Sequence, residues 1–384
     1  MKVLHLISSA DLYGAERTLC NLFAEAARIK AADPEAADPR FSLAVMTPLD
    51  RPTPLIAEAE ARGVPTLILP AGLKDSPRAL WQLGRALGRS HREGSGPDIL
   101  HSHGYKGLSL ALVMAKLFDL PLVHTQHGFI RNSRKLRFYM GLDMFLCHWR
   151  TVRRVICVSR TIRDEYLETG TAADKLALLP NAVPLPDLKV RPDTERTEAG
   201  PVCLAVCRLD WEKGPDILLD AFAQVQDEFP EARLWIAGDG PLRPMLEERT
   251  RELGLESRAR FWGFTDRVAE LLAQADMLLL PSRTEGMPMA LLEAMSWGLP
   301  SVCATVGETP RLIDESGAGI LTPTGSAEAF AQGLRVLLAT GPAERRRMGQ
   351  AGRDYVAAHC SMPAYMTRLR RIYAEAAGRE GAHV

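Results

Sequence analysis

The sequence predicts two α/β domains in tandem, each built on a doubly wound parallel sheet. The first observation is length, because 384 residues exceed what one compact core usually holds. The second is an alternation of short Val-, Ile- and Leu-rich runs with helical stretches along the whole chain, which is typical of parallel sheets covered on both faces. The third is a segment rich in proline and charge, residues 179–200, which separates two such series.

Each series contains six predicted strands. Those of the first half are KVLHLIS, FSLAVMT, PTLILP, DILHSH, LPLVHTQHG and RRVICVS. Those of the second half are VCLAVCRL, ARLWIAG, ARFWGF, MLLLPS, PSVCAT and AGILT. We expect domains at residues 1–185 and 201–360, joined by a linker at 186–200, with a cleft between them. Ligands of such sheets bind beyond the carboxyl ends of the strands, so we expect the functional residues in the loops that follow.

The composition argues against several classes of function. Lys plus Arg equals Asp plus Glu at 47 each, so no overall charge favours nucleic acid. The first residues, MKVLHLIS, are followed by polar sequence without a signal-peptide pattern, and no run reaches about 18 apolar residues. We therefore expect a cytoplasmic protein. The seven cysteines form no CxxC pair, which favours small buried side chains in a reducing compartment over disulfides or a zinc site.

The loop after the first strand, SSADLYGAERTL, places Gly14 at the start of a helix. A glycine there lets backbone amides approach a phosphate or a sugar. The spacing differs from GxGxxG, which disfavours a dinucleotide-binding dehydrogenase.

Two cations follow the first strand of the second half, in CRLDWEKGPDILLDAF. Arg208 lies at the strand end and Lys213 just before the glycine that begins a helix, and neither has an obvious partner. A planar guanidinium and a point charge together suit a diphosphate; the alternative is two solvated surface charges. Gly238 in IAGDGPLR and Gly263 in FWGFTDR repeat the order of strand, glycine and helix, and Gly263 with Phe264 is suited to cover a nucleobase.

The stretch EGMPMALLEAMSWGLPSV carries Glu285 and Glu293 eight positions apart. Pro288 suits a first helical turn and the GLP sequence ends the helix, so residues 289–297 are predicted as a short helix. Its free amides favour an anion or a polyol, and Glu293 can accept hydroxyl hydrogen bonds from a ribose or a hexose. The alternative is an ordinary amphipathic helix with a solvated acid.

Histidines cluster in HSHG and HTQHG, as His101, His103, His124 and His127. Four imidazoles near adjacent strand ends suggest zinc. However, His101 and His103 share one face of a strand while His124 and His127 point differently, and no acidic residue or cysteine stands at ligand spacing. We therefore expect no metal site, and we expect His127 to be catalytic or to position a sugar.

Together these motifs resemble the retaining glycosyltransferases of family 4, also called group 1. That resemblance implies the GT-B fold, in which two Rossmann-like domains face each other across a cleft. The resemblance covers nearly the whole chain. The motifs in this order are far more specific for the family than any one motif alone. The stretches that carry it are EGMPMALLEAMSWGLPSV, CRLDWEKG, IAGDGPLR, FTDRVAELLAQADMLLLPS, HTQHG, VICVS and LPNAV.

The resemblance implies roles for the candidate residues. Arg208 and Lys213 look like the pair that binds the donor diphosphate, Glu293 like the acid on the donor ribose, and Glu285 like the acid at the donor sugar. With His127, the residues Glu285, Arg208 and Lys213 are the implied catalytic set. The implied donor-binding set is Gly14, Arg208, Lys213, Gly238, Gly263, Phe264, Glu285, Gly286, Met287, Met289, Ala290 and Glu293.

The implied reaction moves a sugar from a nucleoside-diphosphate sugar to an acceptor hydroxyl with retention, in cell-envelope polysaccharide or glycolipid synthesis. The donor is a co-substrate, no cofactor is expected, and the chain has no DxD motif that would require a metal ion. The alternatives are a nucleotide-sugar epimerase, a phosphorylase that needs pyridoxal phosphate and a non-catalytic nucleotide-sugar-binding subunit. The base, uridine or guanosine, stays open.

Two departures from the family pattern concern phosphate or acceptor contacts. Tyr13-Gly14 stands where the family usually has paired glycines, and VGETPRL places Glu308 and Arg311 where relatives have Gly and Glu. The contacts made by these two loops therefore stay open.

The C-terminal stretch PAYMTRLRRIYAEAA is amphipathic, with Tyr365, Leu369 and Tyr373 on one face. In the GT-B fold such a helix, here within residues 361–384, crosses back to the first domain.

The segment RNSRKLRFYMGLDMFLCHWRTVRR, residues 131–154, carries seven Lys or Arg residues against one acid, Asp143. Its apolar residues recur at helical spacing: Phe138, Leu142, Phe145, Trp149 and Val152. This pattern suits a helix on an anionic membrane surface, at the inner face of the plasma membrane, beside a glycan or lipid-linked acceptor. The alternative is that the apolar stripe packs on the first domain.

Overall fold

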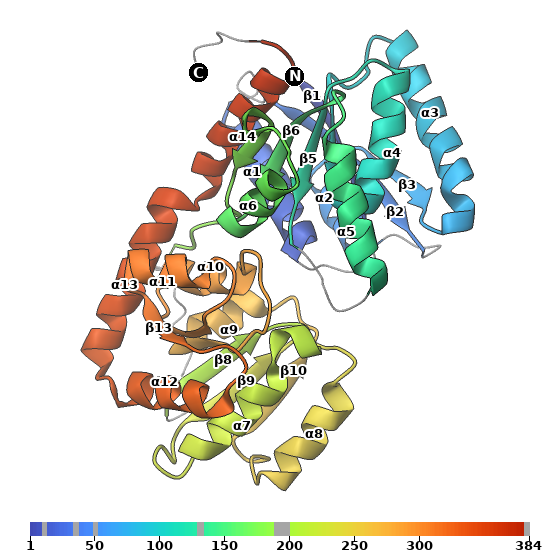
Figure 1. Ribbon diagram of the computed structural model, residues 1–384. Helices are drawn as coiled ribbons and strands as arrows, with labels where there is room; N and C mark the ends of the chain where they lie inside the picture. Colours follow the sequence, from blue (N-terminus) through green and yellow to red (C-terminus); the bar gives the residue numbers. More distant parts are fainter. Residues whose placement is uncertain (10–13, 34–37, 49–52, 129–133, 188–199, 380–384) are drawn as a thin grey trace. The chain divides into compact units, whose positions relative to one another are not determined.

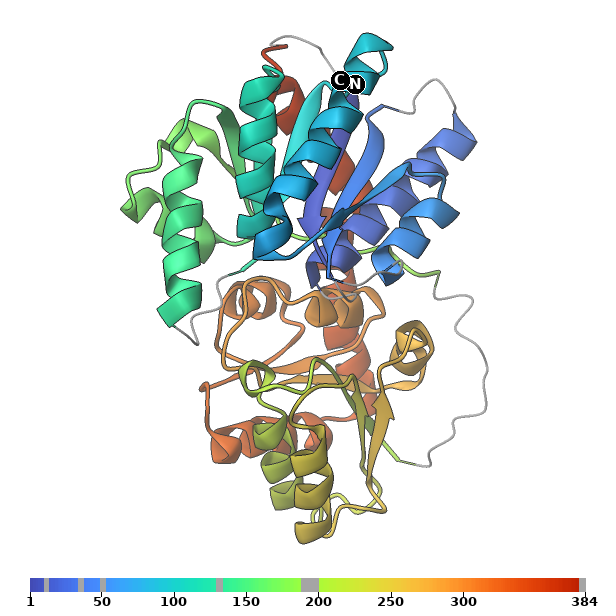
Figure 2. The same cartoon turned by 90° about the vertical axis from the view of Figure 1, so that its right-hand side faces the viewer.

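A computed structural model of the chain describes residues 1–9, 14–33, 38–48, 53–128, 134–187 and 200–379. The chain forms two compact units, each built on a parallel sheet (Figures 1 and 2). The first unit comprises Met1–Asn181 and Met362–Val384, and the second comprises Ala182–Ser361. Two doubly wound α/β units are therefore confirmed. Most of the linker expected at 186–200 lies outside the described residues.

The first unit has a seven-stranded parallel sheet in the order β3-β2-β1-β4-β5-β6-β7. Its strands are β1 (Lys2–Ser8), β2 (Arg40–Thr47), β3 (Thr66–Pro70), β4 (Ile99–His103), β5 (Leu122–Gln126), β6 (Val152–Cys157) and β7 (Leu176–Leu178). The six strands predicted in the first half are confirmed. The edge strand β7 was not predicted, because three half-buried residues are too few to give a pattern.

Helices cover both faces of this sheet. They are α1 (Gly14–Ala32), α2 (Pro54–Ala61), α3 (Ser76–Arg92), α4 (Gly104–Leu117), α5 (Arg134–Cys147), α6 (Arg160–Glu168) and α14 (Met362–Ala376). Ser102 of β4 lies against α4, whereas the preceding His101 hydrogen-bonds Tyr373 of α14. Since successive strand residues point to opposite faces, α4 and α14 lie on opposite sides of the sheet (Figure 1).

The C-terminal helix α14 is part of the first unit, although the second unit precedes it in the sequence. It packs beside α1 and contacts β5 and β6. Tyr365, Leu369 and Tyr373 are all buried, at 7%, 0% and 0% exposure. The apolar face seen in the sequence is therefore the face that packs on this unit.

The second unit has a six-stranded parallel sheet in the order β10-β9-β8-β11-β12-β13. Its strands are β8 (Val202–Val206), β9 (Arg233–Ala237), β10 (Ala259–Gly263), β11 (Met277–Leu280), β12 (Ser301–Ala304) and β13 (Gly319–Thr322), which confirms all six predictions. Its helices are α7 (Pro215–Val225), α8 (Arg243–Glu252), α9 (Val268–Gln274), α10 (Met289–Ser296), α11 (Thr309–Ser316), α12 (Ala327–Ala339) and α13 (Pro342–His359). Phe222 of α7 and Phe330 of α12 are buried together in its core.

The strand order reverses once in each sheet, between β1 and β4 in the first unit and between β8 and β11 in the second. At such a switch point the loops that follow the two strands diverge, and ligands of open parallel sheets bind there. The loops after β8 and β11 carry Arg208, Lys213 and Glu285. In the first unit, His103 is the last residue of β4.

The structure corrects the prediction of one helical apolar stripe along 131–154. Helix α5 ends at Cys147, and Val152 is a fully buried residue of β6. The prediction of this stripe was wrong because Val152 belongs to a strand and because the buried face of α5 includes Asp143 and Cys147. Within the described residues, no helix is both long and apolar enough to span a bilayer.

Candidate functional site

The loop after β8 brings Lys213 to the switch point of the second unit. Asp210 caps a short 3-10 turn, Trp211–Lys213, by accepting a hydrogen bond from the Lys213 amide at 3.2 Å. Gly214 then adopts a left-handed backbone (φ 63°) and leads into α7. A Cβ at Gly214 would lie 2.5 Å from the carbonyl oxygen of Pro281, so glycine allows the loops after β8 and β11 to touch.

Lys213 and Glu285 form an ion pair between these two loops. The Lys213 Nζ atom lies 2.9 Å from each carboxylate oxygen of Glu285, and Ser282 Oγ donates to Oε1 at 2.7 Å. The Glu285 side chain is 7% exposed and that of Lys213 is 29% exposed. Burial opposes the charge of Lys213, but the Glu285 carboxylate outweighs it and raises the Lys213 pKa above its ordinary value.

The second predicted cation, Arg208, forms an ion pair with Asp210. The expectation that neither cation has a partner was therefore wrong for both. The partner of Arg208 stands two residues away in the sequence, so it was visible there. The partner of Lys213 comes from another loop, 72 positions later, and only the fold brings it near. The four side chains balance in charge, as two cations and two carboxylates.

The loop after β12 contacts the loop after β11 and holds it in place. A Cβ at Gly307 would lie 2.4 Å from the Glu285 carbonyl oxygen, and the Glu308 amide donates to the Gly286 carbonyl at 3.0 Å. Glu308 in turn pairs with Arg311 at 2.9 Å, and its side chain is 5% exposed. The two residues that depart from the family pattern thus form an ion pair with each other beside the Glu285 loop, with Glu308 buried and Arg311 half-buried.

Helix α10 begins directly after this loop, with Pro288 as its N-cap and Trp297 as its C-cap. The predicted helix is therefore confirmed to within one residue. Met287 and Met289 are buried, whereas Gly286, Ala290 and Glu293 are half-buried. Glu293 lies in the second turn of the helix whose amino terminus adjoins Glu285.

Gly238 and Gly263 bring the loops after β9 and β10 beside the loop after β8. A Cβ at Gly238 would lie 1.8 Å from the Cys207 carbonyl oxygen, and the Gly238 amide donates to the Gly263 carbonyl at 2.8 Å. Phe264 follows and is 58% exposed. An exposed aromatic ring beside two glycine turns can stack on a flat base.

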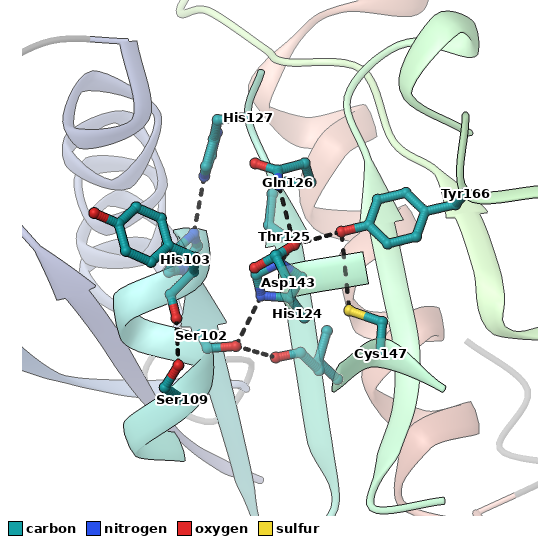
Figure 3. A network of polar contacts seen from close by, with 12 residues as sticks. Ser102, His103, Ser109, His124, Thr125, Gln126, His127, Asp143, Cys147 and Tyr166 are labelled. Atoms are coloured by element: carbon teal, nitrogen blue, oxygen red, sulfur yellow. Dashed lines mark hydrogen bonds and ion pairs between the residues drawn. The ribbon is translucent and has the colours of Figure 1, made fainter. Parts of the chain in front are cut away.

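In the first unit, His127 is the end of a row of three imidazoles that we call the histidine row: His5, His103 and His127. His5 Nδ1 lies 2.9 Å from His103 Nε2, and His103 Nδ1 lies 3.0 Å from His127 Nε2. Figure 3 shows the contact between His103 and His127. Burial lowers the pKa of His5 and of His127 to about 3, and lowers that of His103 well below 6.5. All three rings are therefore neutral near pH 7.

The opposite side of the same strands carries a second polar network (Figure 3). Asp143 Oδ2 accepts from Tyr166 Oη at 2.7 Å and from Gln126 Nε2 at 3.1 Å, and it lies 3.3 Å from His124 Nε2. Ser102 Oγ pairs with His124 Nδ1 at 2.9 Å. No acidic residue or cysteine stands at ligand spacing in the sequence, but the fold brings Asp143 and Cys147 of α5 beside His124.

Two groups of three residues within the described chain have metal-ligand atoms close together. They are His5, His101 and His103, and His124, Asp143 and Cys147. In the first group the rings bind one another and neighbouring hydroxyls, since His101 pairs with Tyr373 Oη and Thr125 Oγ1 at 2.7 Å each. Hydrogen bonds therefore already join His5 to His103 and hold both ring nitrogens of His101.

Gly14 is the first residue of α1 and is exposed. Its carbonyl accepts from Thr18 Oγ1 at 3.0 Å. Tyr13 and the rest of the preceding loop lie outside the described residues.

Comparison with known proteins adds two family matches. Residues 35–186 match the model described as Glycosyltransferase Family 4, and residues 200–340 match the model described as Glycosyl transferases group 1. The two matches lie one in each half of the chain.

Two curated relatives and one solved structure illustrate what this chain is similar to. The D-inositol 3-phosphate glycosyltransferase of Corynebacterium aurimucosum is 29% identical over 310 residues, covering 73% of this chain and 72% of that protein. The UDP-Gal:alpha-D-GlcNAc-diphosphoundecaprenol alpha-1,3-galactosyltransferase of Escherichia coli is 28% identical over 256 residues, covering 62% of this chain and 65% of that protein. The structure of Anabaena HepE in complex with UDP and glucose superposes with a TM-score of 0.80 at 19% identity, covering 97% of this chain and 99% of that one.

Proposed function

The chain belongs to the group 1 glycosyltransferases, family 4, and we propose that it moves a sugar from a nucleoside-diphosphate sugar to an acceptor hydroxyl with retention of configuration. The observation that carries this proposal is the cluster of Arg208, Lys213 and Glu285 at the switch point of the second sheet. Neither an epimerase nor a non-catalytic subunit is favoured by the comparisons.

Arg208 and Lys213 bind the donor diphosphate in this proposal. An ammonium group has three N–H donors, and two of those of Lys213 point at Glu285. The third is left for a phosphate oxygen. Phe264 and Gly263 cover the base and Glu293 accepts from the ribose hydroxyls, with Gly238, Gly286, Met287, Met289 and Ala290 around them. A donor of this class is supported by the UDP and glucose held by HepE.

Retention follows most simply from substitution on the face that the diphosphate leaves. The bond from the anomeric carbon to the diphosphate oxygen breaks, the acceptor oxygen bonds to the same face, and the acceptor proton passes to the leaving diphosphate. Glu285 already accepts three hydrogen bonds, which makes it a weak nucleophile and argues against a covalent intermediate. The two cations stabilise the charge that develops on the leaving group. The proposal needs no metal ion and no cofactor.

The acceptor is a glycan or a lipid-linked molecule of the cell envelope, and the enzyme reaches it from the cytoplasmic membrane face. Exposed apolar side chains on two helices that pack together support this part of the proposal. Helices α4 and α5 and the turn after α5 carry Val113, Leu117, Phe138, Phe145 and Trp149, between 43% and 69% exposed. Lys116 lies 5.9 Å over the Trp149 ring. Lys106, Arg150 and Arg153 are exposed nearby in the sequence.

The test is an activity assay of the purified protein with panels of uridine and guanosine diphosphate sugars and of lipid-linked and soluble glycan acceptors. Release of nucleoside diphosphate only with an acceptor, and a product with the donor's anomeric configuration by NMR, would support the proposal. Change of the donor's stereochemistry without an acceptor would indicate an epimerase. Donor binding without turnover on any acceptor would indicate a binding subunit.

A further inference from the structure

The histidine row runs across three neighbouring strands of the first unit. In the register of β1 and β4, Ile7 stands opposite His103 and His5 stands opposite His101. His5 and His103 therefore point to the same face, two residues apart along the sheet. His103 ends β4 and His127 follows β5, so the row leads from the core to the carboxyl edge of the sheet. Its inner end packs against the rings of Phe23 and Phe41.

Each neutral imidazole has one N–H and one bare nitrogen. Three neutral rings joined by two hydrogen bonds have only two consistent proton orders. In one order, each N–H points outward along the row, from His5 to His103 and from His103 to His127, and His127 keeps its proton on Nδ1. In the other order, each N–H points inward and His5 keeps its proton on Nε2.

The positions of the two ends of the row decide between the two orders. His5 is 0% exposed, and its Nε2 atom has no hydrogen-bond partner among the described residues. The inward order would leave a buried N–H there with nothing to accept it. A buried N–H without an acceptor is rarer than a buried acceptor without a donor. The outward order leaves a bare nitrogen beside Phe23 and Phe41. It moves the N–H without a partner to His127 Nδ1, which is also buried but follows β5 at the carboxyl edge of the sheet, where ligands of parallel sheets bind.

We propose that His103 is a positioning residue that fixes His127 as a neutral ring with its proton on Nδ1, so that His127 donates a hydrogen bond to a substrate oxygen. His127 Nδ1 is buried and has no partner among the described residues, so a substrate oxygen that reaches this edge of the sheet would satisfy its N–H. His127 is then a donor and not a general base, because its other nitrogen is occupied by the His103 N–H. This inference rests on the proposed glycosyl transfer for the identity of the substrate.

The first test needs no substrate. In protein labelled with 15N-histidine, long-range 1H–15N spectra distinguish protonated from bare ring nitrogens, and N–N couplings across hydrogen bonds identify the pairs. His5→Phe, His103→Asn and His127→Gln variants assign the signals among the nine histidines. We expect a proton on His127 Nδ1, a bare His127 Nε2 coupled to His103, and no titration between about pH 6 and 8. A proton on His127 Nε2 would overturn the inference.

The second test uses substitutions at position 103. His103→Leu removes the N–H that faces His127, so kcat should fall at least about tenfold, the effect of about 1.4 kcal/mol, while nucleoside-diphosphate affinity stays unchanged. His103→Asn places an amide donor where Nδ1 stood, and it should recover most of kcat and keep the His127 proton on Nδ1. Ser102→Ala, on the same strand but the opposite face, is the control for a buried change and should behave as wild type.

The outcomes separate this inference from the proposed function. If the wild type transfers sugar and His103→Leu has the same kcat, or if His103→Asn is no better than His103→Leu, the inference is wrong while the function stands. If the spectra show the expected protons and no nucleotide sugar is turned over, the proton order stands and the role assigned to it fails. Should His103→Leu not fold, the spectra of the wild type and the kinetics of His103→Asn still decide.

Discussion

Lys213 Nζ lies 2.9 Å from both carboxylate oxygens of Glu285, although 72 positions separate the two residues. The pair joins the loop after β8 to the loop after β11 at the point where the strand order reverses. Each residue is therefore placed by the other, and the removal of either leaves the charge of a buried carboxylate or of a half-buried ammonium group without its partner.

Replacing Lys213 by Met should lower kcat/KM by at least about a hundredfold, because it removes a diphosphate contact and leaves Glu285 without its ion partner. Isothermal titration calorimetry with UDP and GDP should show weakened binding of whichever nucleotide the wild type prefers. Ser282→Ala, which removes one uncharged hydrogen bond to Glu285, is the matched control and should lose far less. Equal loss in both variants would contradict a specific role for the cation.

Replacing Glu293 by Gln should weaken nucleoside-diphosphate binding by about tenfold, since a carboxylate accepts two ribose hydroxyls better than an amide does. The measurement is calorimetry with the nucleoside diphosphate and with inorganic pyrophosphate. Pyrophosphate has no ribose, so its affinity should not change. An unchanged affinity for the nucleoside diphosphate would show that Glu293 does not hold the ribose.

Acidification should destabilise the first unit through its buried histidines. A histidine whose pKa is lowered on folding contributes stability that is present above about pH 6.5 and is lost as the pH falls toward 3. Between neutral pH and pH 5, the loss of unfolding free energy due to His5 alone amounts to about 2 kcal/mol. Urea unfolding of wild type and His5→Phe at pH 7.5 and at pH 5 should show that the variant loses less stability between the two values.

The control for that experiment is Phe41→Leu. In the wild type, the ring centroid of Phe41 lies 5.2 Å from that of His5. This change disturbs the same part of the core without removing a titrating group, so it should keep the pH dependence of the wild type. If His5→Phe keeps the full pH dependence as well, His5 is not a source of acid sensitivity.

Deleting the residues after Ser361 should prevent soluble folding of the first unit, because the deletion exposes the surface that α14 covers. A milder change is Tyr373→Phe, which leaves His101 Nδ1 buried without its partner at 2.7 Å. We expect this variant to lose about 1–2 kcal/mol of unfolding free energy. Tyr365→Phe, elsewhere on the same helix, is the control. A fully active protein lacking α14 would contradict this packing.

The exposed apolar side chains of α4 and α5 should bind vesicles that contain anionic lipid. Each Lys or Arg near such a surface adds about 1 kcal/mol, so flotation should rise with anionic lipid and fall with salt. Replacing Phe138 and Phe145 by Ser should reduce binding, whereas Trp81→Ser, at another exposed aromatic residue on α3, 62% exposed, should not. Equal and negligible binding to neutral and anionic vesicles would indicate a soluble acceptor.

The fold was largely predictable because its inner strands, such as β11 and β12, are buried throughout and are seen as runs rich in apolar residues. The short edge strand β7 escaped, since it is half-buried and has three residues. The helix that follows Glu285 was predictable from Pro288 and the GLP stop, since such signals are local.

The contacts of the site were less predictable, because most of them join distant segments. The sequence suggested Lys213 and Glu285 separately, but only the meeting of two loops pairs them. Likewise, nothing in the spacing of HTQHG indicates that Asp143 of α5 lies beside His124. His5 was overlooked because it stands singly in the first strand, and its relation to His127 passes through a third residue.

The second unit is an insertion within the first, and its two ends meet. Val183 and Ser361 form a β-bridge, and the Val183 amide donates to the Cys360 carbonyl at 3.0 Å. During synthesis the inserted unit therefore emerges whole from the ribosome while the first unit still lacks α14. The bond from Tyr373 to His101, and with it the closed core around the histidines, forms only after α14 has left the ribosome.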